Sequence, residues 1–206
     1  MNDIPVNRWE LGGEQHAGYA VRFAELIARG ADIDGEARLA DVLVPREARI
    51  LDAGSGMGRV AAALHRRGHL VTAVEKDPAL IAQSRERFPD VPVVESDILG
   101  LSPTMLSKAS LPTAYDLITV VGNVMILLAE ATERRVLSKL GGLLNGDGRM
   151  LVGFRTSAGP GNSRDYPWTE FEADAAESGL VVQHRFGTYD LGAPDDDYVV
   201  AVLGSR

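Results

Sequence analysis

The stretch 50–58, ILDAGSGMG, constrains the fold of this chain more than any other. Aliphatic and β-branched residues crowd positions 48–53 and predict a short buried strand. Three glycines at alternate positions follow Asp52, and the segment 57–67 behind them can form a helix. Strand, glycine turn and helix in this order present free backbone N–H groups and the positive end of a helix to a ligand. The stretch therefore predicts a site for a nucleotide-like cofactor; the alternative is a tight turn without a ligand.

The spacing of the glycines separates three classes of cofactor. A phosphate-cradling P-loop ends in Gly-Lys-Ser/Thr, which this sequence lacks. The dinucleotide fingerprint G-x-G-x-x-G needs a third glycine at position 59, which is Arg59. The chain has G-x-G-x-G instead, with Asp52 two residues before the first glycine. This pattern resembles the nucleotide-binding turn of class I S-adenosylmethionine (SAM)-dependent methyltransferases.

Length, charge and composition narrow the class of protein. A chain of 206 residues can bury one sizeable core, so we expect a single domain over 1–206, with an N-terminal helical extension (1–45) and a Rossmann-like core (46–206). The net charge of −8 argues against a nucleic-acid partner. With no cysteine and four scattered histidines, we expect neither disulfides nor a metal site. No membrane-length apolar run or signal-peptide pattern is present, so we expect a cytoplasmic monomer or homodimer without a membrane partner.

Predicted helices and strands alternate along the chain. Helices are predicted over 14–28, 36–43, 57–67, 78–88, 130–144 and 169–178, and strands over 48–53, 70–75, 91–95, 115–121, 149–155, 180–189 and 198–203. Residues 1–13 are expected to be mobile, 98–113 irregular and 156–167 a flexible loop. The alternation predicts an α/β fold: a three-layer, doubly wound, mostly parallel seven-stranded sheet closed by a C-terminal antiparallel hairpin. This order resembles the sheet of the class I methyltransferases.

Local end signals accompany two of these helices. Asp77 is expected to cap the helix that opens with Pro78 at its first position. Thr169 and Glu172 are expected to form a capping box.

The resemblance assigns a ribose-binding acid. Ribose has two adjacent hydroxyls that one carboxylate can accept, and in an α/β sheet this acid lies about 20 residues after the glycine turn, at the end of the second strand. Glu75 stands there, 17 residues after Gly58, followed by Lys76. The family more often has the shorter aspartate. The alternative is that Glu75 is an ordinary acid at a strand end.

The resemblance also implies contacts for the adenine and the methionine part. Asp97 would accept from the adenine amino group and the Ile98 backbone would donate to a ring nitrogen, although Ser96 replaces the family's glycine. The alternative for Asp97 is a turn cap. Asp52 would hold the turn, and Gly122-Asn123 would lie nearest the transferred methyl. The predicted cofactor-binding set is Asp52, Ala53, Gly54, Ser55, Gly56, Gly58, Glu75, Lys76, Asp97, Ile98, Gly122 and Asn123.

The predicted reaction is methyl transfer from SAM to a small-molecule acceptor by in-line displacement. Such a reaction needs alignment, and it needs a base only where the acceptor loses a proton, so no catalytic residue is assigned. The substrate-side candidates are Tyr19, Arg22, Arg155 and Trp168. The N-terminal helices would roof the cofactor or pad a sheet edge, and Arg155 would hold an anionic substrate or pair with a surface carboxylate. A SAM-binding protein without transferase activity and a nicotinamide-dependent oxidoreductase are the alternatives, and the acceptor atom stays open. 

Overall fold

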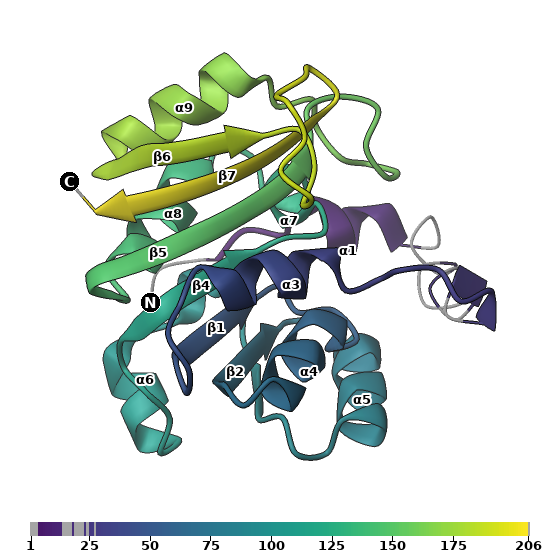
Figure 1. Cartoon of the computed structure of the whole chain (residues 1–206), viewed down its shortest axis with the longest axis vertical. Coiled ribbons are helices and arrows are strands. Elements are labelled where there is room, and N and C mark those ends of the chain that lie inside the picture. Colours follow the sequence, from purple (N-terminus) through teal and green to yellow (C-terminus); the bar gives the residue numbers. More distant parts are fainter. Residues whose placement is uncertain (1–3, 14–17, 19–22, 24, 27, 206) are drawn as a thin grey trace.

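The computed structural model describes residues 4–13, 18, 23, 25–26 and 28–205. They contain one sheet in the order β3-β2-β1-β4-β5-β7-β6 (Figure 1). Its strands are β1 (Arg49–Ala53), β2 (Leu70–Glu75), β3 (Val93–Glu95), β4 (Tyr115–Val120), β5 (Leu144–Arg155), β6 (Leu180–Phe186) and β7 (Tyr198–Ser205). The strands β1 to β5 pair in parallel, whereas β7 is antiparallel to both β5 and β6. The predicted fold class, including the C-terminal hairpin, is confirmed.

Helices pack on both faces of this sheet. One face carries α3 (Gly35–Val42), α4 (Arg59–Arg66) and α5 (Pro78–Arg87). The other carries η2 (Ile98–Gly100), α6 (Pro103–Lys108), α8 (Glu133–Gly141) and α9 (Trp168–Glu177). Two short helices, α1 (Arg8–Gly12) and α7 (Val124–Leu127), lie side by side where the parallel strands end (Figure 1).

The central strands are buried on both faces, which explains their nearly continuous apolar sequences. In β1, Leu51 and Ala53 belong to one apolar cluster and Ile50 to the other. Because the strands are parallel, their carboxyl ends meet at one edge of the sheet. The register aligns Asp52 with Ala73 of β2 on one side and with Thr119 of β4 on the other. The glycine turn after β1 therefore lies between the ends of β2 and β4.

The structure corrects several local predictions. Residues 8–12 form a helix rather than a mobile tail, because Asn7 and Glu10 make a reciprocal capping box. The segment 98–113, predicted to be irregular with room for one helical turn, contains both η2 and α6; Ser102 caps α6, and Pro103 occupies its first turn. No side chain caps α9, so the predicted box of Thr169 and Glu172 is wrong. 

Two further differences concern helix α7 and strand β5. Residues 124–127 form α7, which the sequence analysis did not predict. Residues 145–148, which the sequence analysis left between the predicted helix 130–144 and the predicted strand 149–155, lie inside β5. A register shift opposite Tyr115 and Leu117 accommodates them. The helix predicted over 14–28 falls largely outside the described residues.

Candidate active site

The glycine turn depends on backbone conformations that favour glycine. Gly54, Gly56 and Gly58 have φ angles of 77°, 57° and 83°, in the left-handed region. Two of them also lack space for a side chain. A Cβ on Gly54 would lie 2.7 Å from a methyl group of Val124, and one on Gly58 would lie 2.3 Å from the hydroxyl of Ser84. The alternate glycines therefore allow a tight turn whose backbone lies close to its neighbours.

Asp52 braces this turn from beneath. Its side chain is buried, and its two oxygens accept hydrogen bonds from the Thr119 hydroxyl at 2.7 Å and from the Ala61 N–H at 3.1 Å. Burial raises the pKa of Asp52 to about 6, although both hydrogen bonds favour the ionised form. One carboxylate thus connects β1, β4 and the first turns of α4, as expected for a residue that holds the turn.

Glu75 connects the end of β2 to the glycine turn. Its Oε2 accepts from the Gly56 N–H at 2.8 Å, and its Oε1 accepts from the N–H groups of Lys76 and Asp77 at 2.7 and 2.9 Å. Burial raises the pKa of Glu75, and the three backbone donors oppose that shift. The acid and the turn singled out from the sequence therefore form one site.

The residues after β3 lie next to this acid. Lys76 Nζ forms ion pairs with Glu10 at 2.7 Å and with Asp97 at 3.4 Å. Asp97 also caps η2, because its Oδ1 accepts from the Leu99 N–H at 2.9 Å. Ile98, the first residue of η2, is buried. The structure thus brings Lys76, Asp97 and Ile98 together beside Glu75, and Asp97 performs the capping role that was its alternative.

Helix α1 covers the same edge. The Trp9 indole N–H donates to Asp77 Oδ2 at 2.8 Å, and Arg8 donates to the Leu128 carbonyl, just beyond α7, at 2.7 Å. Asp77 also caps α5 as predicted, accepting from Ala79 and Leu80. The helix therefore reaches from the end of α7 to the start of α5. Its sequence signal was the Asn7 and Glu10 pair, three residues apart, which the sequence analysis overlooked.

Gly122 and Asn123 connect the ends of β4 and β5. Both have left-handed φ angles, 73° and 75°. The Asn123 N–H donates to the Gly153 carbonyl at 3.2 Å, and its Oδ1 accepts from the Arg155 N–H at 2.9 Å. The structure thus places Asn123 and Arg155 next to each other at the carboxyl edge, where β4 and β5 end.

The other substrate-side candidates lie elsewhere. Trp168 stacks on Phe171 and on the Arg185 guanidinium of β6, the edge strand farthest from β1 on its side of the sheet. The structure therefore does not bring Trp168 to the glycine turn. Tyr19 and Arg22 lie outside the described residues. 

Two tyrosines near Arg155 were missed by the sequence analysis. Tyr198 is the register partner of Arg155, and its hydroxyl lies 3.2 Å from that of Tyr189. A Cβ on Gly153 would overlap the Tyr189 hydroxyl, so this ring lies directly on β5. No local motif marks these residues, because their position depends on the pairing of β7 with β5.

Arg59, at the third-glycine position of the dinucleotide fingerprint, fixes the N-terminal part of the chain to the turn. Its guanidinium binds the Glu36 carboxylate with two hydrogen bonds of 2.9 and 2.6 Å. It also lies 5.0 Å from the centre of the Phe23 ring. A glycine at this position would lose these contacts.

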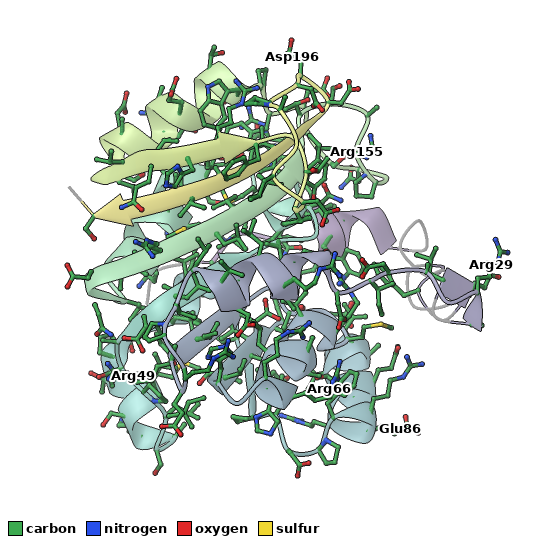
Figure 2. All side chains as sticks on the ribbon, viewed as in Figure 1. Arg29, Arg49, Arg66, Glu86, Arg155 and Asp196 are labelled. Atoms are coloured by element: carbon green, nitrogen blue, oxygen red, sulfur yellow. The ribbon has the colours of Figure 1, made fainter. Side chains whose placement is uncertain are left out.

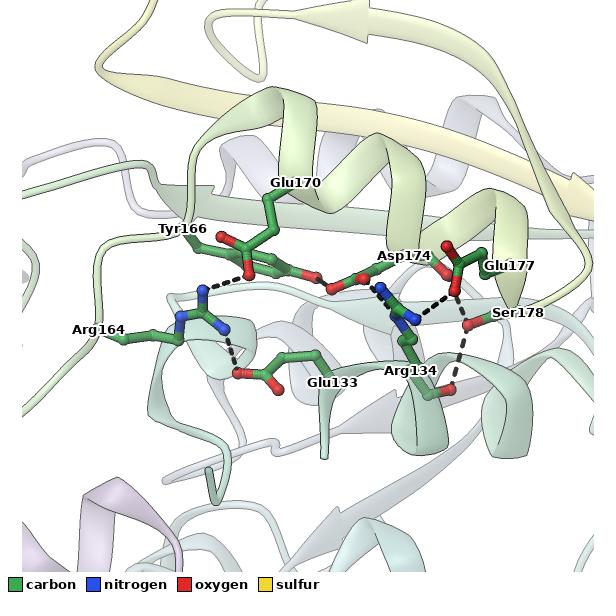
Figure 3. Close-up of polar contacts among 8 residues, drawn as sticks. All are labelled: Glu133, Arg134, Arg164, Tyr166, Glu170, Asp174, Glu177 and Ser178. Atoms are coloured by element: carbon green, nitrogen blue, oxygen red, sulfur yellow. Dashed lines mark hydrogen bonds and ion pairs between the residues drawn. The ribbon is translucent and has the colours of Figure 1, made fainter. Parts of the chain in front are cut away.

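A polar network anchors the segment 156–167 to α8 and α9 (Figure 3). Arg164 donates to Glu133 at 2.7 Å and to Glu170 at 2.5 Å. The hydroxyl of the buried Tyr166 donates to Asp174 at 2.7 Å. These bonds tie down the second half of the segment for which the sequence predicted a flexible loop.

Two kinds of feature are absent from the described part of the chain. No cluster of three or more histidine, aspartate or glutamate side chains there could hold a metal ion. None of the helices there has both the length and the apolar character needed to cross a membrane.

Comparison with known proteins identifies the family. Residues 50–148 match the family model described as "Methyltransferase domain". A crystal structure of a TehB-like SAM-dependent methyltransferase from Corynebacterium glutamicum is 34% identical, with a TM-score of 0.81, over 94% of this chain and 99% of that one. This chain belongs to the class I SAM-dependent methyltransferases. Its cofactor is SAM.

Two further proteins are similar to this chain, one in sequence and one in fold. An uncharacterized methyltransferase of Mycobacterium tuberculosis (strain H37Rv) is 36% identical over 118 residues, which are 55% of this chain. The chain spans about half (54%) of the length of that relative. The glycopeptide N-methyltransferase MtfA in complex with SAM has the same fold, with 17% identity and a TM-score of 0.65 over 84% of this chain and 95% of that one.

Proposed function

We propose that this methyltransferase binds SAM along the carboxyl ends of β1, β2 and β4 and transfers its methyl group to a small molecule. The hydrogen bond between the Gly56 N–H and the Glu75 carboxylate carries the proposal. It joins a bare backbone turn, which a side chain at Gly54 or Gly58 would obstruct, to an acid with two acceptor oxygens. These are the groups that a nucleoside with a cationic amino-acid end requires.

The residues present fit this cofactor. Glu75 would accept from the ribose hydroxyls, Asp97 would accept from the adenine amino group and the Ile98 N–H would donate to the ring. The methionine end would be held by backbone groups of the glycine turn and of Gly122-Asn123. The set is that predicted from the sequence: Asp52, Ala53, Gly54, Ser55, Gly56, Gly58, Glu75, Lys76, Asp97, Ile98, Gly122 and Asn123.

When bound, SAM supplies a methyl group already activated by its sulfonium. The protein's task is then to align the acceptor and exclude water. Helix α1 suits the second task, because Trp9 and Glu10 bind Asp77 and Lys76 at the start of α5. No general base is assigned.

Charge supports a small-molecule acceptor. The net charge of −8 opposes binding of a nucleic-acid backbone, which needs a basic surface. Asn162 of the segment 156–167 donates to the Arg8 carbonyl, and Arg8 donates to the Leu128 carbonyl. These contacts at the carboxyl edge favour a small acceptor. The proposal includes the cytoplasmic location and the monomeric or homodimeric state expected from the sequence.

Ligand-induced stabilisation tests cofactor binding. S-adenosylhomocysteine (SAH) at 100 times its Kd should add about 2.7 kcal/mol to the free energy of unfolding. For a chain of this size that raises the melting temperature by roughly 5–11 °C. NAD at the same concentration should leave it unchanged. Stabilisation by NAD and not by SAH would overturn the proposal.

A second assay tests the acceptor class. SAM is incubated with the enzyme and either the fraction of a cell extract below 3 kDa or total RNA and DNA, and SAH is quantified by mass spectrometry. We expect enzyme-dependent SAH only with the small-molecule fraction. SAH formation only with the nucleic acids would refute the small-molecule acceptor.

A further inference from the structure

The hydroxyl pair of Tyr189 and Tyr198 lies across the end of β4 from the glycine turn. Val120 of β4 and Val152 of β5 are the last register pair between these two strands. The next residue of β5 is Gly153, against which the Tyr189 hydroxyl lies. On the other side of β4 stands β1, which leads into the turn. Neighbouring strands are about 4.8 Å apart, so β1 and β5 are separated by roughly 10 Å. An acceptor held near Gly153 would thus face a methyl donor held by the turn.

One hydroxyl of this pair can donate a hydrogen bond to a ligand. The two oxygens are 3.2 Å apart, so one O–H donates to the other oxygen. Neither hydroxyl has another hydrogen-bond partner among the described residues, which leaves the second proton unused. Burial raises the pKa of Tyr198 to about 12 and that of Tyr189 well above its usual value. Both phenols therefore stay protonated, as donors, at neutral pH.

Arg155 supplies a positive charge beside these hydroxyls. It is the register partner of Tyr198, so both side chains lie on the same face of the sheet. Figure 2 labels Arg155. Arg155 acts on the pKa of Tyr198, as do Arg59 and Glu36. The charges of Arg59 and Glu36 cancel in their bidentate pair. The guanidinium of Arg155, by contrast, forms no salt bridge with any residue in the described part of the chain.

The acidic residues before β7 do not neutralise this arginine. Asp195 accepts from the backbone N–H groups of Asp197 and Tyr198. Asp196 pairs with Arg185 at 3.7 Å. No salt bridge joins Asp195, Asp196 or Asp197 to Arg155, so its guanidinium is available to an anionic ligand.

We propose that Arg155, Tyr189 and Tyr198 form an acceptor subsite that binds the carboxylate of a small-molecule substrate. The guanidinium binds the carboxylate, and the free tyrosyl O–H donates to it. Binding of this carboxylate orients the acceptor toward the glycine turn. This assignment rests on the proposed function, because it positions the substrate carboxylate relative to a methyl donor bound at that turn.

Binding of benzoate and its neutral analogue benzamide tests the subsite. Each compound is titrated into the full chain, with and without saturating SAH, and followed by NMR chemical shifts. We expect benzoate to bind at least tenfold more tightly than benzamide. Arg155→Gln should weaken benzoate binding about 10- to 100-fold, and Tyr189→Phe or Tyr198→Phe about 3- to 10-fold, leaving benzamide unchanged. 

A matched control is Arg135→Gln, which removes an exposed arginine from α8 on the opposite face of the sheet. It should leave benzoate binding unchanged. Equal binding of benzoate and benzamide would overturn the subsite, as would tighter binding of phenyl phosphate. Tyrosine variants that lower only the melting temperature, with benzoate affinity intact, would assign the pair a packing role instead.

The failure of this subsite can be told apart from failure of the proposed function. SAH binding reports on the glycine turn and Glu75, neither of which is altered in these variants. Wild-type protein that binds SAH and does not discriminate between benzoate and benzamide would refute the subsite alone. Protein that binds benzoate as expected and no SAH would refute the cofactor site alone.

Discussion

Replacing Glu75 by glutamine separates its charge from its shape. The carboxylate accepts from three backbone N–H groups, one in the glycine turn and two at the start of the next helix. Glutamine has nearly the same size and keeps one acceptor oxygen. Its amide nitrogen, however, cannot accept a hydrogen bond, so it cannot bind a ribose hydroxyl as the carboxylate oxygen that it replaces would.

The expected loss of affinity follows from one charge-assisted hydrogen bond. Such a bond contributes about 1.5–3 kcal/mol. Because each 1.4 kcal/mol is a factor of ten in Kd, Glu75→Gln should weaken SAH binding roughly 10- to 150-fold. In a thermal assay with SAH at 100 times the wild-type Kd, a hundredfold loss reduces the ligand-induced stabilisation from about 2.7 to about 0.4 kcal/mol. The stability of the free variant is measured separately, so only the increment due to ligand is compared.

Glu95 offers a matched control. It is the register partner of Glu75 at the end of β3, and its side chain is exposed. Glu95→Gln removes the same charge one strand away and should leave SAH affinity unchanged. The assigned role of Glu75 would be refuted if Glu75→Gln bound SAH within twofold of wild type, or if both variants weakened it equally.

Three further substitutions test how the turn is braced. Because burial raises the pKa of Asp52 from 3.8 to about 6, the folded state binds its proton more tightly than the unfolded state does. The free energy of unfolding of wild type should therefore fall by about 2 kcal/mol from pH 4 to pH 7, and that of Asp52→Asn should lack this fall; urea unfolding at both pH values measures it, and equal falls in the two proteins would contradict the reasoning. Gly58→Ala should lower the free energy of unfolding by about 1–3 kcal/mol more than Gly68→Ala does, because both glycines have a positive φ but only Gly58 lacks space for a Cβ. Equal unfolding midpoints of the two variants would exclude the clash. Glu36→Gln should lower the free energy of urea unfolding by about 2–3 kcal/mol, because it removes the carboxylate from the largely buried ion pair with Arg59; a loss below about 0.5 kcal/mol would show that this pair is dispensable.

The features predicted correctly are those that short segments determine by themselves. The predicted strand 70–75 coincides with β2, because its aliphatic residues fit a strand buried on both faces. The cap of α5 was predicted because Asp77 followed by Pro78 satisfies two helix-start preferences at once. Ser102 followed by Pro103 is the same kind of signal and would have predicted α6.

The features that were missed depend on contacts between distant segments. Thr169 and Glu172 have the spacing of a capping box, yet α9 begins at Trp168, whose ring packs on Phe171 and Arg185. Tertiary packing therefore decided the start of this helix. Tyr189 reaches the site only because β7 pairs with β5, which no local pattern of residues could reveal.

Two departures from the family's sequence pattern each have a structural partner in this chain. Glu75, where aspartate is more common, uses its longer side chain to reach the Gly56 N–H in the turn. Ser96, in place of glycine, donates from its hydroxyl to the Asp97 carbonyl at 2.8 Å, which braces the segment that leads into η2. Each substitution supplies a contact to a neighbouring segment, so the departures alter how the turn is held while the site keeps its place at the carboxyl edge of the sheet.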